Sequence, residues 1–405
     1  MRLMWLLAIS CAAAAQSEWP QFGGPNRNFM VDDPGLTGDW PAAGPKVLWQ
    51  RALGDGYSGT SVSGGVAFTM FKRGVDDITT AIDTKTGKTL WEYAASRNTD
   101  RRLDLQFGSG PHSTPLIVDG RLFTVNTVGK LLALDVKTGK LLWTHDLWGE
   151  LHGSNLDRGY SASPIAWKDT IILPVGGKQQ ALVAFRQKDG SIAWRREDYD
   201  CTFSSPFFID LNGLTQLVLF YGRQVVGFNA DNGDPQWSVT HRTEYNLNIA
   251  LPVYGPDGIL VMSSAYDGGS RGIQLTRDGQ QTRVKELWDH KRLRVHHGNM
   301  LRLGDYVYGS SGDFGPAPLT CVNVKDGKVV WQDRALGKSS LLQAGSKTIL
   351  LSEDGDLALA TLSPEGLKII SRASLLRSNA WTAPSLAGGI LYVRDRSSIA
   401  AVSLR

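Results

Sequence analysis

Histidines are concentrated in a few long polar segments of this sequence. Five of the seven, His112, His145, His152, His296 and His297, fall within residues 93–113, 144–161 and 291–299, and His241 opens a fourth segment at 241–248. A neutral imidazole can bind a ligand or a metal, and it titrates near neutral pH. These segments, together with 377–381, are where chemistry is expected.

The same segments carry guanidinium and aromatic groups. Arginine matches carboxylate or phosphate bidentately, and an aromatic ring can stack on a flat or sugar-like ligand. Alternatively, each arginine is a solvated charge on a loop, and each aromatic ring fills space inside the channel without binding a ligand. The candidate ligand-binding residues are Arg101, Arg102, His112, His152, Arg158, Tyr160, Tyr245, Asn246, Arg294, His296, His297 and Trp381.

Catalytic and metal-binding patterns are missing from the sequence. Carboxylates are sparse in these segments, and no adjacent acid or amide suggests a calcium site. His296 and His297 are expected to point to opposite sides at the start of a strand, so they do not suggest a metal pair. The glycine-rich "VGG" and "YDGGS" lack the context of a phosphate loop. The sequence predicts no catalytic residue and no metal site.

A repeat must position these segments. "AIDTKTGKTLW" (81–91) returns as "ALDVKTGKLLW" (133–143), "AFRQKDGSIAW" (184–194), "GFNADNGDPQW" (227–237) and "CVNVKDGKVVW" (321–331). A degenerate copy at 273–288 carries five extra residues, and another at 358–370 has Ile370 in place of tryptophan. The structural residues of the repeat are Gly87, Trp91, Gly139, Trp143, Gly190, Trp194, Gly233, Trp237, Trp288, Gly327 and Trp331.

Each copy is typical of a hairpin whose glycine takes a positive φ in the turn and whose tryptophan ends the return strand. Another strand pair precedes each hairpin, so a unit has four antiparallel strands, A to D. Eight such units predict an all-β, eight-bladed β-propeller. The chain ends inside a third strand, and "PKVLWQRALG" (45–54) is a fourth strand without a hairpin. We therefore expect residues 46–52, with Trp49, to complete the last blade and close the ring.

The predicted organisation is a signal peptide at 1–15, an extended arm at 16–45 lying on the ring, and a single propeller at 46–405. Arg2, the apolar "LMWLLAIS" and the small Ala13 and Ala15 favour a secretory signal. "AISC" leaves a lipid anchor at Cys11 open as an alternative. No later segment is long and apolar enough to span a membrane, and Cys201 and Cys321 are expected to be core residues of different blades.

The motif A-x-D-x-x-T-G-x-x-x-W resembles the repeat of quinoprotein alcohol dehydrogenases, eight-bladed propellers that bind pyrroloquinoline quinone. The propeller lipoprotein of the outer-membrane β-barrel assembly machinery shares that repeat and has no redox activity. "EWPQFGGPNRN" (18–28), "GYSASP", "FSSP" and "LYVRD" look like a largely uncharacterised bacterial branch of quinone-binding-like propellers. The resemblance implies the fold, but it does not determine the activity, because the repeat is structural.

The sequence favours a non-catalytic periplasmic or secreted propeller. Its partner would be a protein, peptide or glycan, bound through the polar mouth of the central channel, and no cofactor is expected. The alternative is an alcohol or sugar dehydrogenase that uses pyrroloquinoline quinone and Ca²⁺; the sequence lacks the Cys-Cys pair and the C-x-x-C-H haem motif found in many such enzymes. A net charge of +4 and the lack of any run of five basic residues argue against nucleic acid.

Overall fold

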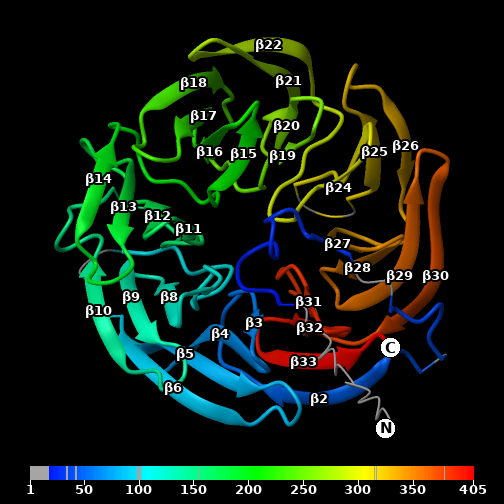
Figure 1. Ribbon diagram of the computed structural model, residues 1–405. Coiled ribbons are helices and arrows are strands. Elements are labelled where there is room, and N and C mark those ends of the chain that lie inside the picture. Colours follow the sequence, from blue (N-terminus) through cyan, green and yellow to red (C-terminus); the bar gives the residue numbers. More distant parts are fainter. Residues whose placement is uncertain are drawn as a thin grey trace, which may run out of the picture.

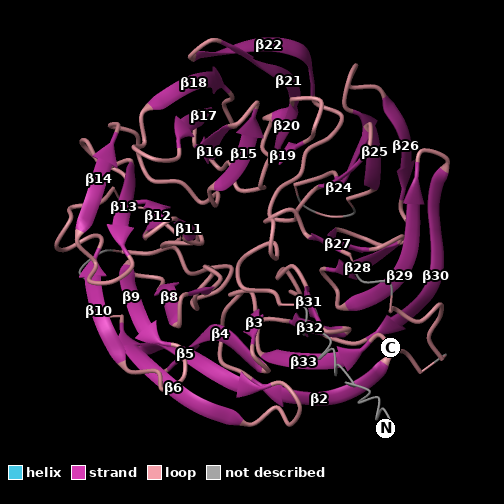
Figure 2. Cartoon of the chain, viewed as in Figure 1, coloured by secondary structure: helices cyan, strands magenta, loops and turns pink. Residues whose placement is uncertain are grey.

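The computed structural model describes residues 18–32, 35–41, 43–97, 102–154, 156–313, 315, 317–377 and 379–405. These residues form strands and no helix, in eight sheets arranged around a central axis (Figures 1 and 2). The predicted all-β, eight-bladed propeller is confirmed. No helix capable of spanning a membrane occurs in this part of the chain. The predicted signal peptide, Cys11 and Arg101 lie outside the described residues.

The first four blades run in chain order. Blade 1 is β3 (Ser61–Ser63), β4 (Val66–Arg73), β5 (Asp76–Asp83) and β6 (Thr89–Ser96); blade 2 is β7 (Leu116–Val118), β8 (Arg121–Val125), β9 (Lys130–Asp135) and β10 (Leu141–Asp146). Blade 3 is β11 (Ile165–Trp167), β12 (Thr170–Pro174), β13 (Leu182–Arg186) and β14 (Ile192–Arg196); blade 4 is β15 (Phe207–Leu211), β16 (Leu214–Tyr221), β17 (Gln224–Asn229) and β18 (Pro235–Thr240).

The remaining blades complete the ring. Blade 5 is β19 (Val253–Tyr254), β20 (Ile259–Ser264), β21 (Gly269–Asp278) and β22 (Gln281–His290); blade 6 is β23 (Leu301–Leu303), β24 (Tyr306–Ser310), β25 (Leu319–Asn323) and β26 (Val329–Asp333). Blade 7 is β27 (Ser339–Ala344), β28 (Lys347–Ser352), β29 (Asp356–Ser363) and β30 (Gly366–Ser374), with β1 (Met30–Val31) added; blade 8 is β31 (Ser385–Ala387), β32 (Ile390–Arg394), β33 (Ser398–Ser403) and β2 (Lys46–Ala52).

Burial within a blade follows from its two packed faces. In β9, "KLLALD", the four central residues are all buried, because neighbouring blades cover both sides of the inner strands. In the outermost strand β10, "LLWTHD", exposure alternates. Strand A of each blade therefore lies nearest the axis and strand D at the rim (Figure 1).

The repeated tryptophan joins each blade to the next. Within its own blade it faces a small residue across the sheet, as Trp91 faces Ala81. Its ring then lies on the turn glycine of the following blade: Trp91 on Gly139 and Trp143 on Gly190. The indole Nε1 of Trp91 donates a hydrogen bond to Val136 O (3.2 Å). Equivalent bonds run from Trp49 to Thr84, from Trp143 to Gln187, from Trp288 to Val324 and from Trp331 to Ser363.

The Trp194 ring of blade 3 also lies on the turn glycine of the next blade, Gly233, but in the described part of the chain its Nε1 makes no such bond. Blades 4 and 7 depart further from this pattern. Trp237 donates to Gln216 Oε1 in its own blade (2.7 Å), and Gln216 Nε2 donates to Thr282 Oγ1 of blade 5 (2.7 Å), whose β21–β22 hairpin carries the five extra residues. In blade 7, Ile370 lies in a bulge, and Ser371 occupies the register position of the tryptophan. The interpretation that Ile370 replaces the tryptophan was wrong. Every blade has a bulge at this point, as between Ala81 and Ile82 in blade 1, and in blade 7 the residue in the position of Trp91 is Ser371, which lies opposite Leu359.

Ring closure matches the prediction. β2 pairs antiparallel with β33, and Trp49 lies opposite Ala401. The N-terminal strand thus supplies the outermost strand of the sheet that the C-terminal residues begin.

The prediction placed the whole arm on the ring, but part of the arm lies inside the channel. Residues 18–32 enter the channel, where the dark-blue segment in Figure 1 lies inside the ring. Trp19 exchanges two backbone hydrogen bonds with Val62, and β1 pairs parallel with β27, the inner strand of blade 7. The Arg27 guanidinium is buried and donates to the carbonyl oxygens of Pro164 and Pro206. The arm thus occupies space along the axis that the short inner strands of the blades do not fill.

Candidate functional site

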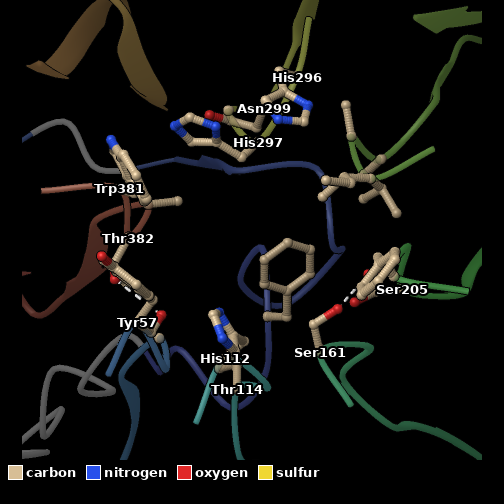
Figure 3. Close-up of a pocket in the computed structure, with 18 of the residues that line it drawn as sticks. Tyr57, His112, Thr114, Ser161, Ser205, His296, His297, Asn299, Trp381 and Thr382 are labelled. Atoms are coloured by element: carbon tan, nitrogen blue, oxygen red, sulfur yellow. Dashed lines mark hydrogen bonds between the residues drawn. The ribbon is translucent and has the colours of Figure 1, made fainter. Parts of the chain in front are cut away.

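The D-to-A loops of all eight blades meet at one end of the channel and surround a cavity of ≈ 340 Å³. Three B-to-C loops contribute as well, through Tyr266, Asp313 and Glu353. Trp19, Phe22 and Phe29 of the arm also line the cavity. Figure 3 shows how side chains from distant parts of the sequence converge on it. We call this space the mouth cavity.

Stacked rings form one wall of the mouth cavity (Figure 3). The ring of Tyr57 stacks on that of Trp381 (centroids 5.2 Å apart, planes at 24°) and on that of His112 (5.5 Å, 29°). The Tyr57 hydroxyl donates to Phe107 O (2.6 Å), and Thr382 Oγ1 donates to Tyr57 O (2.9 Å). These bonds fix the aromatic wall before any ligand enters.

Charged groups stand at the edge of the cavity in compensated pairs. Lys338 Nζ donates to Asp313 O (2.6 Å) and lies 3.9 Å from Glu353 Oε2. The same Glu353 oxygen accepts a hydrogen bond from Trp381 Nε1 (3.1 Å). Arg158 forms an ion pair with Asp104 and lies over the Phe107 ring, 4.9 Å from its centroid. The mouth is thus more aromatic than the polar mouth that the sequence predicted.

The histidines of the cavity are neutral at pH 7. Burial lowers the pKa of His112 and of His296 to about 4, and it lowers the pKa of His297 well below its usual value. His296 Nδ1 and His297 Nε2 have no hydrogen-bond partner among the described residues. Both residues line the cavity, but these two nitrogens are themselves buried.

His296 and His297 were expected to point to opposite sides, but they do not. Both rings line the mouth cavity, with centroids 5.1 Å apart. The alternation of side chains holds only within an extended strand, and β23 begins later, at Leu301.

Five of the predicted ligand-binding residues line the mouth cavity: His112, Arg158, His296, His297 and Trp381. Tyr245 is 59% exposed and packs edge-on against Tyr266 (5.3 Å), just outside the cavity lining.

Five others lie elsewhere. Tyr160 is buried in the core, packs on Trp148, and donates to Val175 O (3.0 Å). Arg102, His152 and Asn246 are exposed and are not part of the cavity wall. Arg294 pairs with Asp313 (3.3 Å) in a neighbouring groove.

The sequence did not identify Tyr57, Tyr266, Lys338 or Glu353 as cavity residues. Tyr57 follows the closing strand β2 in a short loop, and Glu353 lies in a short B-to-C loop. Loop length and polarity, the signals used to find candidates, were both weak there. The position of a loop within the four-strand unit, D-to-A or B-to-C, predicts these cavity residues better than its length or polarity does.

The donor groups do not fit Ca²⁺, which takes six to eight oxygen ligands. Both carboxylates of the cavity lining are bound by cations, Asp313 by Arg294 and Glu353 by Lys338. No group of three His, Cys, Asp or Glu side chains in the described part of the chain is arranged to hold a metal. Cys201 and Cys321 are buried and unpaired.

Fold and repeat define a propeller built from pyrroloquinoline quinone-type repeats. The family profile described as outer membrane protein assembly factor BamB matches residues 75–333, more than half of the chain. The chain therefore belongs to this family. It is 24% identical to the outer membrane protein assembly factor BamB of Yersinia pestis over 307 residues, which cover 70% of this chain and 72% of that protein.

A second kind of relative carries the same repeat. The chain is 30% identical over 280 residues to the dehydrogenase subunit of the quinone alcohol dehydrogenase of Gluconobacter oxydans (strain 621H). That match covers 60% of this chain and 33% of the relative, so the chain spans about a third of the dehydrogenase.

Solved structures agree on the fold. BamB from Moraxella catarrhalis superposes with a TM-score of 0.62 at 17% identity, covering 88% of this chain and 97% of that one. The quinohemoprotein alcohol dehydrogenase from Comamonas testosteroni gives 0.68 at 13% identity, covering 97% and 81%. Both identities are too low to carry more than the architecture.

Proposed function

We propose that this protein is a non-catalytic periplasmic or secreted propeller that binds a peptide segment of a protein partner in the mouth cavity. The observation that supports this proposal is the wall of stacked aromatic rings formed by Tyr57, Trp381 and His112 in the mouth cavity. Ligand sites are mostly apolar hollows with a few fixed polar groups. An apolar or aromatic side chain fits this description, and the uncharged rings of His296 and His297 form part of the same lining.

Family membership supports a protein partner, because the Yersinia relative is named an assembly factor for outer membrane proteins. A glycan would also stack on aromatic rings, but its many hydroxyls need polar partners. The charged groups at the edge are already engaged with one another. The proposed location agrees with the predicted signal peptide at 1–15.

The test is a displayed peptide library selected against the purified protein, followed by titration of a selected peptide. Trp381→Ala removes the centre of the aromatic wall, and we expect the Kd to rise about tenfold or more. Trp167→Ala is the matched control, because Trp167 packs on Phe208 at an A-to-B turn outside the cavity. Equal binding by Trp381→Ala and the parent would place the binding surface elsewhere.

A second candidate, favoured by the similarity to the Gluconobacter subunit, is a dehydrogenase that uses pyrroloquinoline quinone and Ca²⁺. The paired carboxylates argue against the calcium ion. Adding the quinone with Ca²⁺ to the purified protein tests it directly. A shifted quinone absorbance together with dye reduction by alcohols would establish the enzyme and refute the binding proposal.

A further inference from the structure

A second hollow lies beside the mouth cavity and is lined by cations. It measures ≈ 500 Å³ and is formed by the D-to-A loop of blades 5 and 6, the B-to-C loop of blade 6 and the end of β26. Its charged lining residues are Lys291, Arg292, Arg294, Asp313 and Arg334. We call it the basic groove.

Two of the four cations are already compensated. Lys291 Nζ lies 2.6 Å from Asp267 Oδ1, and Arg294 pairs with Asp313. Arg292 and Arg334 are exposed, and neither guanidinium has a hydrogen-bond or ion-pair partner within the described ranges. The groove therefore carries two positive charges that no carboxylate of the described residues balances.

The backbone that carries Arg292 is held in place. Its amide donates to His290 Nδ1 (3.2 Å), and its carbonyl oxygen accepts a hydrogen bond from Ser311 Oγ (3.1 Å). The ring of His290 in turn stacks on Trp288, with centroids 4.9 Å apart. Arg334 follows Asp333, whose carboxylate accepts from the amide of Ala335 (2.7 Å). Both guanidinium groups thus extend from ordered backbone, which reduces the entropy lost on binding an anion.

The basic groove and the mouth cavity share a wall. Asp313 lines both, and its carbonyl oxygen is bound by Lys338 of the cavity while its carboxylate is bound by Arg294 of the groove. One extended ligand can therefore lie in both hollows.

We infer that the basic groove binds acidic residues of the same peptide whose apolar or aromatic residue enters the mouth cavity. The inference depends on the proposed function and specifies the chemistry of its partner. A guanidinium fork binds a carboxylate through two charge-assisted hydrogen bonds. The preferred peptide then has a short acidic run beside a large apolar side chain.

An anionic membrane surface is the less suitable partner. Membrane attachment by charge uses a broad cluster of basic residues on one face, whereas here only two cations without a partner among the described residues line one hollow between blades 5 and 6. The formal net charge of the whole chain is only +4.

The experiment uses three synthetic peptides that differ in one feature each. The first has a run of glutamates beside a tryptophan, the second has glutamines in place of the glutamates, and the third has alanine in place of the tryptophan. Binding is measured by fluorescence anisotropy for the parent, for Arg292→Glu/Arg334→Glu, and for Trp381→Ala. The control is Lys85→Glu/Lys137→Glu, which changes the charge equally in two C-to-D turns outside both hollows.

We expect Arg292→Glu/Arg334→Glu to weaken binding of the glutamate peptide at least about tenfold and to leave the weaker binding of the glutamine peptide unchanged. The control variant should behave as the parent. The affinity for the glutamate peptide should also fall with added salt.

Three results would overturn the inference. If Trp381→Ala weakens binding while Arg292→Glu/Arg334→Glu does not, the mouth cavity binds the peptide but the groove takes no part. If neither variant matters, the proposed function fails as well. If vesicles containing an anionic lipid bind the parent and not Arg292→Glu/Arg334→Glu, and the glutamate peptide does not bind, the partner is a membrane.

Discussion

At the scale of single residues, the site is built from histidines that stay uncharged. Desolvation accounts for this, since it is the largest cause of the lowered pKa at His112, His241, His296 and His297. A neutral imidazole keeps one donor and one acceptor. The wall of the mouth cavity can therefore bind an uncharged group, such as a peptide backbone, without bringing a counter-charge inside.

The lowered pKa values predict that acid destabilises the protein. Between pH 6.5 and about 4, the unfolded chain binds protons at these histidines and the folded chain does not. The free energy of unfolding therefore falls as pH falls, by up to about 1.4 kcal/mol per pH unit for each histidine. Urea denaturation at pH 7, 6 and 5 measures it. His241→Asn should reduce the slope, and a flat profile would contradict the prediction.

Sequence located part of the site at this scale. Residues placed by the repeat, such as His112 and Trp381, were correctly assigned to loops around the channel axis. Tyr160 lies in the core because its ring packs beneath Gly129 and against Trp148. The sequence of a single repeat does not predict this contact, because the contact depends on how two loops pack against each other.

At the scale of secondary-structure elements, contacts between tryptophan and glycine determine how blades stack. Gly139 has φ +70°, and a Cβ there would come within 2.5 Å of the Trp91 ring. Gly120 has φ +73° in an A-to-B turn, and a Cβ there would meet nothing within 4 Å. The two glycines have the same backbone conformation, but a side chain of the neighbouring blade packs only on Gly139.

This pair separates backbone strain from packing. Gly120→Ala should lower the free energy of unfolding by about 1–2 kcal/mol through strain alone. Gly139→Ala should lose a further 1–3 kcal/mol or so, because the added methyl displaces Trp91. Chemical denaturation of both variants provides the comparison. Equal losses would mean that the ring moves aside without cost.

The repeat predicted these contacts because small residue, glycine and tryptophan keep a fixed spacing. It could not predict blade 7, where Ser371, opposite Leu359, occupies the tryptophan position. Ser371 Oγ accepts a hydrogen bond from the backbone amide of Trp40 (2.9 Å), and Trp40 is buried. The arm thus covers the blade that lacks its own tryptophan, a compensation between segments more than 300 residues apart.

At the scale of the whole molecule, the ring closes within blade 8, and blade 8 then packs on blade 1. The pairing of β2 with β33 was predictable, because the last repeat lacks its fourth strand and the segment at 45–54 is a fourth strand without a hairpin. The side chains that join the closed blade 8 to blade 1 were not. Arg394, the last residue of β32, and Arg396, in the turn after it, make these contacts, one from a buried position and the other from the surface.

These two arginines make different contacts with blade 1. Arg394 is 1% exposed, and it donates to Gly56 O (2.7 Å), Met70 O (2.9 Å) and Ser58 O (3.0 Å). Burial lowers its pKa to about 10, so the group stays protonated at pH 7. The side chain of Arg396 is 39% exposed and pairs with Asp55.

Arg394→Met should therefore cost far more than Arg396→Met. The first leaves buried carbonyl oxygens without a donor, and we expect the free energy of unfolding to fall by about 3 kcal/mol or more. The second removes a partly exposed ion pair, for which the expected loss is below about 1 kcal/mol. Urea midpoints at pH 7 compare them, and limited proteolysis in the loop after β2 should accelerate only in Arg394→Met. If both variants lost the same free energy, the buried bonds would add nothing to closure, and the strand pairing of β2 with β33 would hold the ring alone.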